Sequence, residues 1–246
     1  TIPFIRRSYN LINSSYESKK FFEEMKNKPE LEVSMQDEEA ARYNDVLRNS
    51  ETAMIDPFTA TEFEVDYDFI RDSDEVFAYL SIPKLNRNDP IYLGASQKHM
   101  ADGVAQVDGT AIPIGGIGNR SVIAGHRGWW GDVRYLYLHK LKNGDRLYVK
   151  RGDKTLTYEV IGQGVIGPYD WEKLEADKDR DLLTLMTCEP FRPPRPNRLI
   201  INCERIAEET ALEKAEMEAR EKALAEGAVA EKTDLASVET LSLIHI

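Results

Sequence analysis

Cys188 is the residue of this sequence best suited to nucleophilic chemistry. A thiolate attacks a carbonyl carbon well and forms a thioester that an amine can later resolve. Cys188 ends the apolar run that starts at Leu182, and Glu189 and Pro190 follow it directly. Its side chain is therefore expected at the rim of the fold, where a strand stops. The second cysteine, Cys203, lies inside the next apolar run and is expected to be a buried, inert thiol.

His126 is the histidine best placed to help such a thiol. A cysteine has an ordinary pKa of about 8.5 and needs a neighbouring base or cation to react at neutral pH. His126 follows an apolar run and lies between glycines in Ala124–Gly128, and we expect these small neighbours to let a substrate backbone approach. His99 and His139 are expected to be surface or packing histidines, and His245 lies in the terminal tail.

An arginine supplies the third candidate group, because acyl transfer needs a donor where charge develops on the carbonyl oxygen. Arg198 opens the last strong apolar run. Its guanidinium would lie near the sulfur if that strand pairs with the one that ends at Cys188. Arg192 and Arg195 compete for this role. We favour Arg198 because it alone begins a strand, whereas prolines surround the other two and keep them out of a ladder.

The elements that would position these residues lie in a β-rich region, residues 71–206. Short aliphatic and aromatic runs recur there, separated by turn signals such as Asn143-Gly144-Asp145. Many short strands at this spacing predict a mainly β fold, a closed barrel or a sandwich, with a helix-like interruption at Asp132 to Leu141. The predicted strands are 77–82, 91–93, 121–124, 146–150, 155–161, 182–187 and 199–201.

Two polar regions flank the β-rich region. Residues 1–70 are rich in helix formers, and Ser34 with Asp37 and Glu38 predicts a helix start. Residues 207–246 begin with Ala, Glu, Lys and Leu and predict an exposed acidic helix followed by a tail. The predicted face of the N-terminal helix consists of Ala40, Tyr43, Val46 and Leu47.

The composition narrows the class of protein. The 246 residues are 41% hydrophobic and 30% charged, as in an ordinary soluble protein, and the net charge of −11 argues against a general nucleic-acid binder. Two cysteines make no disulfide framework, and no C-x-x-C or histidine-rich pattern suggests a metal or another cofactor. No run reaches the roughly 18 apolar residues of a membrane span.

The candidate residues lie in a series of segments that resembles the sortase family. Thr184–Cys188 matches the T-L-x-T-C signature of sortases, and Ala124–Gly128 and an arginine about ten residues after the cysteine are also similar to that family. The order and spacing of these segments across about 130 residues make chance a poor explanation. Further similar segments are Ser81–Leu85, Pro90–Gly94, Gly109–Gly116 and Leu141–Asp145.

The resemblance implies an eight-stranded sortase β-barrel and a cysteine transpeptidase. We expect no cofactor, and a calcium-assisted form is the open alternative, although no acidic cluster on a loop demands the ion. Such an enzyme cleaves an LPXTG-like sorting signal between threonine and glycine. Cys188 would form a thioester with the threonine, and His126 would protonate the departing amine and deprotonate the incoming one. Arg198 would bind the oxyanion or the substrate backbone. The implied partners are pilins or surface proteins that carry the signal, and an acceptor amine.

The segment Asp56-Pro57-Phe58 resembles the lid motif of class C, or pilin-polymerising, sortases. It lies after a long polar extension and before the barrel region. The resemblance implies that Asp56 lies against Arg198 and that Phe58 lies over the sulfur of Cys188. The carboxylate would satisfy a buried guanidinium, and the ring would shield the thiol from water.

Two features depart from the class C pattern. Glu189 stands where that pattern usually has a small or hydroxyl residue, and the loop after Cys188 is proline-rich and about one residue longer. We expect a pilus-type enzyme that joins the threonine to a pilin lysine. The alternatives are a housekeeping-type sortase that anchors surface proteins to peptidoglycan and a catalytically silent pilin-binding barrel, against which the intact trio of residues argues.

A sortase would work at the extracellular face of the membrane of a Gram-positive bacterium. The chain starts at Thr1 rather than at a methionine, so we expect a piece of a longer protein whose membrane anchor lies outside it. Residues 241–246 have two interpretations, a vector-derived end or the start of a second apolar span.

Overall fold

The computed structural model describes residues 18–25, 27–28, 30–49, 54, 56–59, 75–128 and 133–206. The predicted C-terminal helix and tail, residues 207–246, lie outside the described residues, and so does His245. In the part of the chain that is described, no helix combines the length and the apolar composition needed to cross a bilayer.

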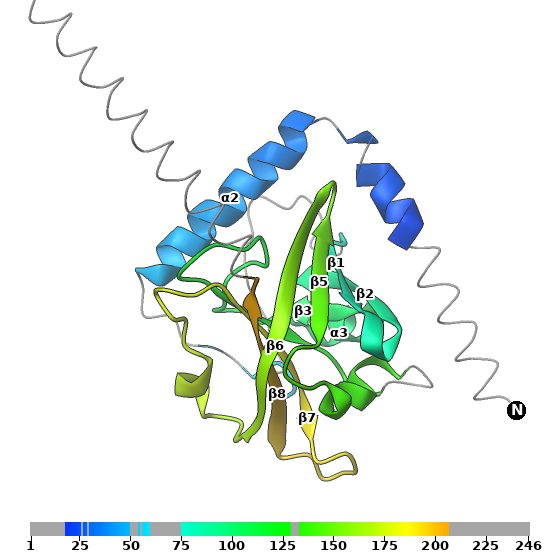
Figure 1. Ribbon diagram of the computed structural model, residues 1–246, viewed down its shortest axis with the longest axis vertical. Helices are drawn as coiled ribbons and strands as arrows, with labels where there is room; N and C mark the ends of the chain where they lie inside the picture. The colour runs from blue at the N-terminus through cyan, green and yellow to red at the C-terminus, as the bar shows by residue number, and fades with distance from the viewer. Residues whose placement is uncertain are drawn as a thin grey trace, which may run out of the picture. The chain divides into compact units, whose positions relative to one another are not determined.

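Eight strands form a closed barrel (Figure 1). Their order around the barrel is β1-β2-β3-β4-β7-β8-β6-β5, and closure leaves no unpaired sheet edge. The prediction of a mainly β fold with an eight-stranded barrel and helices is confirmed. The strands are β1 (Ala78–Ile82), β2 (Arg87–Leu93), β3 (Val104–Gln106), β4 (Arg120–Ala124), β5 (Arg146–Arg151), β6 (Lys154–Ile166), β7 (Leu182–Glu189) and β8 (Asn197–Arg205).

Helical segments lie before and between the strands. Residues 18–25 are helical, and the predicted interruption at 132–141 is a 3-10 helix that is kinked at Tyr135 and Tyr137. Of the other short helices, η1 and α3 connect strands that are neighbours in the barrel, whereas η3 connects β6 to β7, which are separated by β8. The helical elements are α2 (Glu30–Arg48), η1 (Pro83–Leu85), α3 (Gln97–Asp102), η2 (Arg134–Lys140) and η3 (Trp171–Leu174).

Helix α2 differs in two ways from the sequence prediction. It begins at Glu30 rather than at Ser34, because a serine is tolerated inside a helix and need not cap it. The predicted apolar face holds for Ala40, which is buried, and for Tyr43, which packs against the same core cluster, whereas Val46 is 67% exposed. Asn44, one turn after Ala40, takes the buried position instead.

Polar contacts fix α2 to the barrel. The side chain of Asn44 donates to the carbonyl oxygen of Ile112 (3.1 Å) and accepts from its amide nitrogen (2.7 Å). The guanidinium of Arg151 on β5 donates to the carboxylate of Asp37 (3.0 Å). These contacts hold α2 at a defined place on the barrel.

Strand β7 is buried on both of its faces. Leu185 packs in the barrel interior. Met186, the next residue, packs in a second cluster with the half-buried Phe58. We call the face of the barrel wall that carries this second cluster the outer face. Successive side chains of a strand point to opposite faces. Cys188, two residues after Met186, therefore belongs to the outer face.

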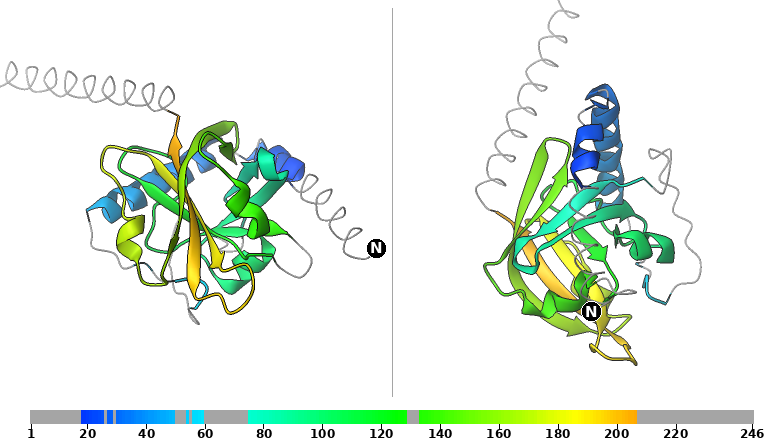
Figure 2. Two further views of the ribbon diagram at one scale, coloured as in Figure 1. Left: turned by 60° about the horizontal axis from the view of Figure 1, so that its bottom comes forward. Right: turned by 90° about the vertical axis from the view of Figure 1, so that its right-hand side faces the viewer.

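Three neighbouring strands meet at one end of the barrel. Strands β4 and β7 are parallel, with Ala124 opposite Met186, so they end at the same rim. Strand β8 is antiparallel to β7 and begins at that rim, and the two lie side by side in Figure 2. Residues more than 60 positions apart in the sequence are thus brought to one place.

Candidate active site

The ends of β4 and β7 hold the segments of His126 and Cys188 together. The amide of Gly125 donates to the carbonyl oxygen of Met186 (3.0 Å), and the hydroxyl of Thr187 donates to the carbonyl oxygen of Gly125 (2.7 Å). His126 and Cys188 are the next residues along these two segments. The register therefore places the imidazole and the thiol at the same rim.

Gly125 serves packing rather than the substrate access that we expected. A Cβ atom at Gly125 would lie 2.8 Å from the ring of Tyr135 and 3.0 Å from the side chain of Val104. Tyr135 is fully buried, and its amide donates to the carbonyl oxygen of His126 (3.3 Å). The glycine lets this ring pack close to the chain and so helps to fix the backbone of the histidine.

Arg198 is the cross-strand partner of Cys188. Directly opposed residues of antiparallel strands have Cα atoms about 4.5–5.5 Å apart, and their side chains share one face. The side chain of Arg198 is 2% exposed. The structure thus places this guanidinium beside the thiol.

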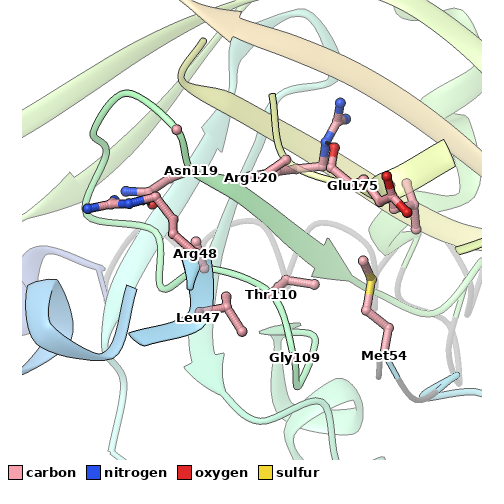
Figure 3. Close-up of a pocket in the computed structure, with 12 residues that line it drawn as sticks. Leu47, Arg48, Met54, Gly109, Thr110, Asn119, Arg120 and Glu175 are labelled. Atoms are coloured by element: carbon pink, nitrogen blue, oxygen red, sulfur yellow. Dashed lines mark hydrogen bonds between the residues drawn. The ribbon is translucent and has the colours of Figure 1, made fainter. Parts of the chain in front are cut away.

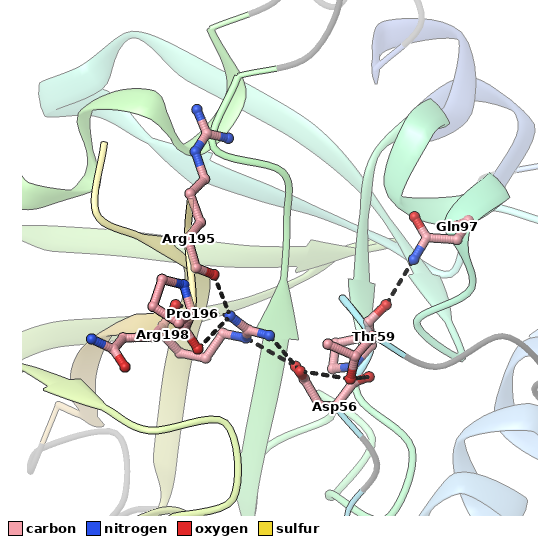
Figure 4. A network of polar contacts seen from close by, with 8 residues as sticks. Asp56, Thr59, Gln97, Arg195, Pro196 and Arg198 are labelled. Carbon is pink, nitrogen blue, oxygen red and sulfur yellow. Dashed lines mark hydrogen bonds and ion pairs between the residues drawn. The ribbon is translucent and has the colours of Figure 1, made fainter. Parts of the chain in front are cut away.

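Every nitrogen of the Arg198 guanidinium donates a hydrogen bond (Figure 4). Nη1 donates to the carbonyl oxygens of Arg195 (3.1 Å), Pro196 (3.3 Å) and Asn197 (2.9 Å). Nε donates to one carboxylate oxygen of Asp56 (3.0 Å), and Nη2 donates to the other. One edge of the guanidinium therefore holds the β7–β8 loop, and the other edge is occupied by the lid-like segment.

Phe58 lies beside two of the candidate residues. Its ring centroid is 6.3 Å from that of the His126 imidazole and 5.0 Å from the central carbon of the Arg198 guanidinium. Phe58 also packs in the same cluster as Met186. The lid-like segment therefore lies against the imidazole and the guanidinium, and the position of its ring over the sulfur of Cys188 stays a prediction.

Two further hydrogen bonds fix the lid-like segment. The side-chain amide of Gln97 at the start of α3 donates to the carbonyl oxygen of Pro57 (2.9 Å). The hydroxyl of Thr59 donates to the carboxylate of Asp56 (2.9 Å). The Gln97 contact is shown in Figure 4. The sequence offered no signal for Gln97, since its importance depends on where α3 lies.

Burial favours the uncharged forms of the thiol and the imidazole. Burial raises the pKa of Cys188, although the charge of Arg198 opposes this shift. Burial, with smaller contributions from Arg134 and Arg195, lowers the pKa of His126 to about 4. At neutral pH the covered site therefore holds a thiol and a neutral imidazole.

The remaining candidates lie in other environments. Arg192 is exposed, and Arg195 is half-buried in the loop after β7, where it donates to the carbonyl oxygen of Phe191 (2.9 Å). His99 is buried and stacks on the ring of Tyr92. Cys203 lies in the barrel interior, and burial strongly raises the pKa of its thiol.

A separate cavity of about 250 Å³ lies at the start of β4 (Figure 3). Leu47 and Arg48 from the end of α2, Met54 and Leu174 contribute to its walls. Cys188, His126 and Arg198 do not line it. It lies at the opposite end of β4 from the candidate site.

Among the described residues, no three side chains of the kind that bind metals are grouped to hold an ion.

Comparison with known proteins identifies the family. A family model described as the sortase domain matches residues 80–206. The chain belongs to the sortase family.

Individual relatives agree with this assignment. Sortase A of Bacillus anthracis is 30% identical over 117 residues, which cover 48% of this chain and 54% of the relative. Sortase SrtE1 of Streptomyces coelicolor is 39% identical over 90 residues, 34% of this chain and 25% of the relative. The chain thus spans about half of the length of the first relative and a quarter of the second.

Solved structures similar to this chain include several class C sortases. Sortase C-3 of Streptococcus pneumoniae has a TM-score of 0.70 and 40% identity, covering 74% of this chain and 87% of that one. A pilus-related sortase C of Group B Streptococcus has a TM-score of 0.69 and 30% identity, and the match covers 76% of this chain and 96% of that one. Sortase C-1 of Actinomyces oris has a TM-score of 0.65 and 31% identity, and the match covers 71% of this chain and 98% of that one. The predicted resemblance to class C sortases is confirmed.

Proposed function

We propose that this protein is a pilus-type transpeptidase that cleaves an LPXTG-like signal between threonine and glycine and joins the threonine to a lysine amine of a pilin. One observation carries the proposal: Cys188 and Arg198 are cross-strand partners beside the His126 segment, under a segment that supplies Asp56 to the guanidinium. The similarity to a pilus-related sortase C supports the choice of substrate class.

The first half-reaction forms a thioester. The sulfur of Cys188 attacks the threonine carbonyl carbon, and the charge that develops on the oxygen is stabilised by donors of Arg198. The carbon–nitrogen bond to glycine breaks. His126 gives a proton to the leaving amine, while the proton of the thiol is transferred to the imidazole, so that the count of protons is unchanged.

The second half-reaction resolves the thioester. The amine of an acceptor lysine attacks the same carbonyl carbon, and His126 accepts the proton that the amine loses. The carbon–sulfur bond breaks, and the thiolate of Cys188 recovers a proton. An isopeptide bond joins the two proteins, and the enzyme returns to its starting form.

The lid-like segment has to leave before this chemistry can begin. In the closed form both outward donors of Arg198 are bound to Asp56, and Phe58 lies next to His126. Removal of the segment would free Nε and Nη2 for the substrate carbonyl, while Nη1 would continue to hold the β7–β8 loop. The closed form is thus a resting state.

The proposal extends to partners and location. The donor substrates would be pilins or surface proteins with the sorting signal. The full-length enzyme would be anchored at the extracellular face of a Gram-positive membrane, where such substrates emerge. The sortase family, to which the chain belongs, is associated with the Gram-positive cell surface, which supports this location.

An acceptor competition tests the proposal. The protein is mixed with a labelled LPXTG-like peptide, a lysine-bearing pilin domain and a peptidoglycan-stem amine, and the products are identified by mass spectrometry. We expect a peptide–pilin isopeptide that is absent with Cys188→Ala. Transfer to the stem amine alone would identify an anchoring enzyme instead, and a bound but unmodified peptide would identify a silent barrel.

A further inference from the structure

The guanidinium of Arg127 connects the end of β7, which carries the thiol, with the segment after β4, which carries the imidazole. Arg127 follows His126, and its Nη1 donates to the carbonyl oxygen of Cys188 (3.0 Å). The same nitrogen contacts the carboxylate of Glu189, the residue after the cysteine. The guanidinium carbon also lies 5.8 Å from the ring centroid of Phe191. One side chain thus contacts the last two residues of β7 and an aromatic ring of the loop that follows.

This ion pair differs from an ordinary surface pair. The side chain of Arg127 is 3% exposed and that of Glu189 is 24% exposed. Exposed pairs contribute about 0–1 kcal/mol, whereas removal of one partner from a buried pair leaves a charge without compensation. Glu189 is therefore needed to keep the Arg127 guanidinium at the backbone of the cysteine.

We propose that Arg127 and Glu189 act as a pair of positioning residues, in which the guanidinium holds the backbone of Cys188 against the His126 segment and the carboxylate holds the guanidinium. This inference rests on the proposed function, because it concerns the geometry of the same reaction. It gives a purpose to Glu189, the residue that departs from the class C pattern.

The place of the contact explains why it matters. The contacts between β4 and β7 end at Gly125, which bonds to Met186 and Thr187. His126 and Cys188 lie just beyond them, and the Arg127 side chain adds a link there. Misplacement of a catalytic group by about 1 Å can reduce a rate about 100-fold. A link at this point keeps the sulfur of Cys188 and the imidazole of His126 at a fixed relative position.

The pair also balances charge around the thiol. A carboxylate disfavours a nearby thiolate and a guanidinium favours it, and Arg127 is one of the cations that favour the thiolate of Cys188. The other charged groups near the sulfur are Asp56 of the lid-like segment, Arg198 at the start of β8 and Arg195 in the loop before it. Removing one member of the Arg127–Glu189 pair leaves the other uncompensated.

The test is whether the two single variants shift the pH midpoint of Cys188 alkylation in opposite directions. The variants are Arg127→Gln, Glu189→Gln and the double variant, and the readouts are the pH midpoint of Cys188 alkylation by iodoacetamide and kcat and KM for peptide transfer. We expect Arg127→Gln to move the midpoint to higher pH and Glu189→Gln to move it to lower pH, each by about half a unit or more. The double variant should return close to the starting midpoint.

The kinetic effect should fall on kcat. Each single variant should lower kcat about 10- to 100-fold with KM changed less than about threefold, because the reacting groups are displaced while binding persists. Arg127→Lys keeps the charge but lacks the planar fork that reaches two acceptors. It should lower kcat and leave the alkylation midpoint unchanged. Arg146→Gln, which removes a member of an exposed pair on β5, is the matched control and should change neither.

Several outcomes would overturn the inference. Midpoints that move in the same direction in both single variants, or kcat values within about threefold of the starting protein, would show that the pair is only structural. Circular dichroism and thermal melting identify a variant that fails to fold, in which case Arg127→Lys decides. Alkylation needs no sorting signal, so a protein that shows the opposite midpoint shifts but transfers no peptide refutes the proposed function and not the pair.

Discussion

The two ends of strand β8 carry the same kind of buried ion pair. At the start of β8, Arg198 pairs with Asp56, and at its end Arg205 pairs with Asp181 (3.4 Å). All four side chains are less than 5% exposed. The two pairs differ in how the carboxylate is held.

Asp181 is fixed by several parts of the barrel. Its carboxylate accepts from the hydroxyl of Tyr158 (2.9 Å) and from the amide of Gly116 (2.8 Å). A Cβ atom at Gly115, where φ is +83°, would lie 2.7 Å from the Arg205 guanidinium. The glycine-rich run at Gly115 and Gly116 therefore packs tightly around the Arg205–Asp181 pair. The pair is thus a fixed part of the barrel, and we call it the framework pair.

Asp56 is held by fewer independent contacts. Besides Arg198 it accepts from Thr59, which belongs to the same turn, and Gln97 holds the neighbouring carbonyl group. The segment precedes the barrel instead of being built into it. The comparison indicates that the number of separate elements that hold a buried carboxylate decides whether a pair is permanent or can be displaced.

Loss of the framework pair should have the largest effect. Asp181→Ala leaves Arg205 buried without its carboxylate and should reduce the free energy of unfolding by about 3–5 kcal/mol, measured by urea denaturation. Asp170→Ala, which removes an exposed carboxylate that pairs with Lys173 and accepts from the amide of Gly167, is the control and should reduce the free energy of unfolding much less than Asp181→Ala does. A loss below about 1 kcal/mol for Asp181→Ala would erase the contrast between the two ends.

Loss of the lid pair should change reactivity more than stability. Asp56→Ala removes two charge-assisted hydrogen bonds, each contributing about 1.5–3 kcal/mol, from the closed state only. Labelling of Cys188 by a small alkylating reagent should become about 10- to 100-fold faster, while the free energy of unfolding falls by less than in Asp181→Ala. Cys203 should stay unlabelled. An unchanged labelling rate would remove the lid interpretation.

The aromatic ring of the lid should control the acidity of the thiol. Burial raises the pKa of Cys188 because the thiolate is the charged form. Phe58→Ala admits water, so the pKa should fall and the pH midpoint of alkylation should move down by about half to one unit. Tyr169→Ala, at a 79% exposed position, is the control. A midpoint that rises in Phe58→Ala would contradict this account.

The smallest effect is expected at Gln97. Its bond to the carbonyl oxygen of Pro57 is between neutral groups and contributes about 1 kcal/mol. Gln97→Ala should therefore accelerate labelling of Cys188 about fivefold, less than Asp56→Ala does. An effect as large as that of Asp56→Ala would show that α3, and not Arg198, mainly holds the segment.

Much of this arrangement could be predicted from the sequence because strand periodicity is local. The runs that end at Ala124 and Thr187 and the one that begins at Leu199 gave the three central strands. The three-residue strand β3 was missed because Val104–Gln106 is too short to show alternation. The closure of eight strands into a barrel was predicted only through the resemblance to sortases, and the order of the strands around it was not predicted.

Contacts between distant loops were beyond sequence reasoning. Nothing in the order of residues shows that Arg127 reaches the carbonyl group of Cys188, because this depends on the parallel register of β4 and β7. The role of Gly125 was misjudged for a similar reason, since Tyr135 lies ten residues away in a 3-10 helix. The assignment of roles to Cys188 and His126 remains a prediction from chemistry and family resemblance.

The most direct test of the central claim is to map the acyl adduct on the lid-opened protein. Asp56→Ala is mixed with an LPXTG-like peptide without an acceptor amine, and the digested protein is analysed by mass spectrometry. The account predicts a thioester on the peptide that contains Cys188, which disappears when Arg198 is also replaced by alanine. An adduct on Cys203, or no adduct on a protein that binds the peptide, would contradict it.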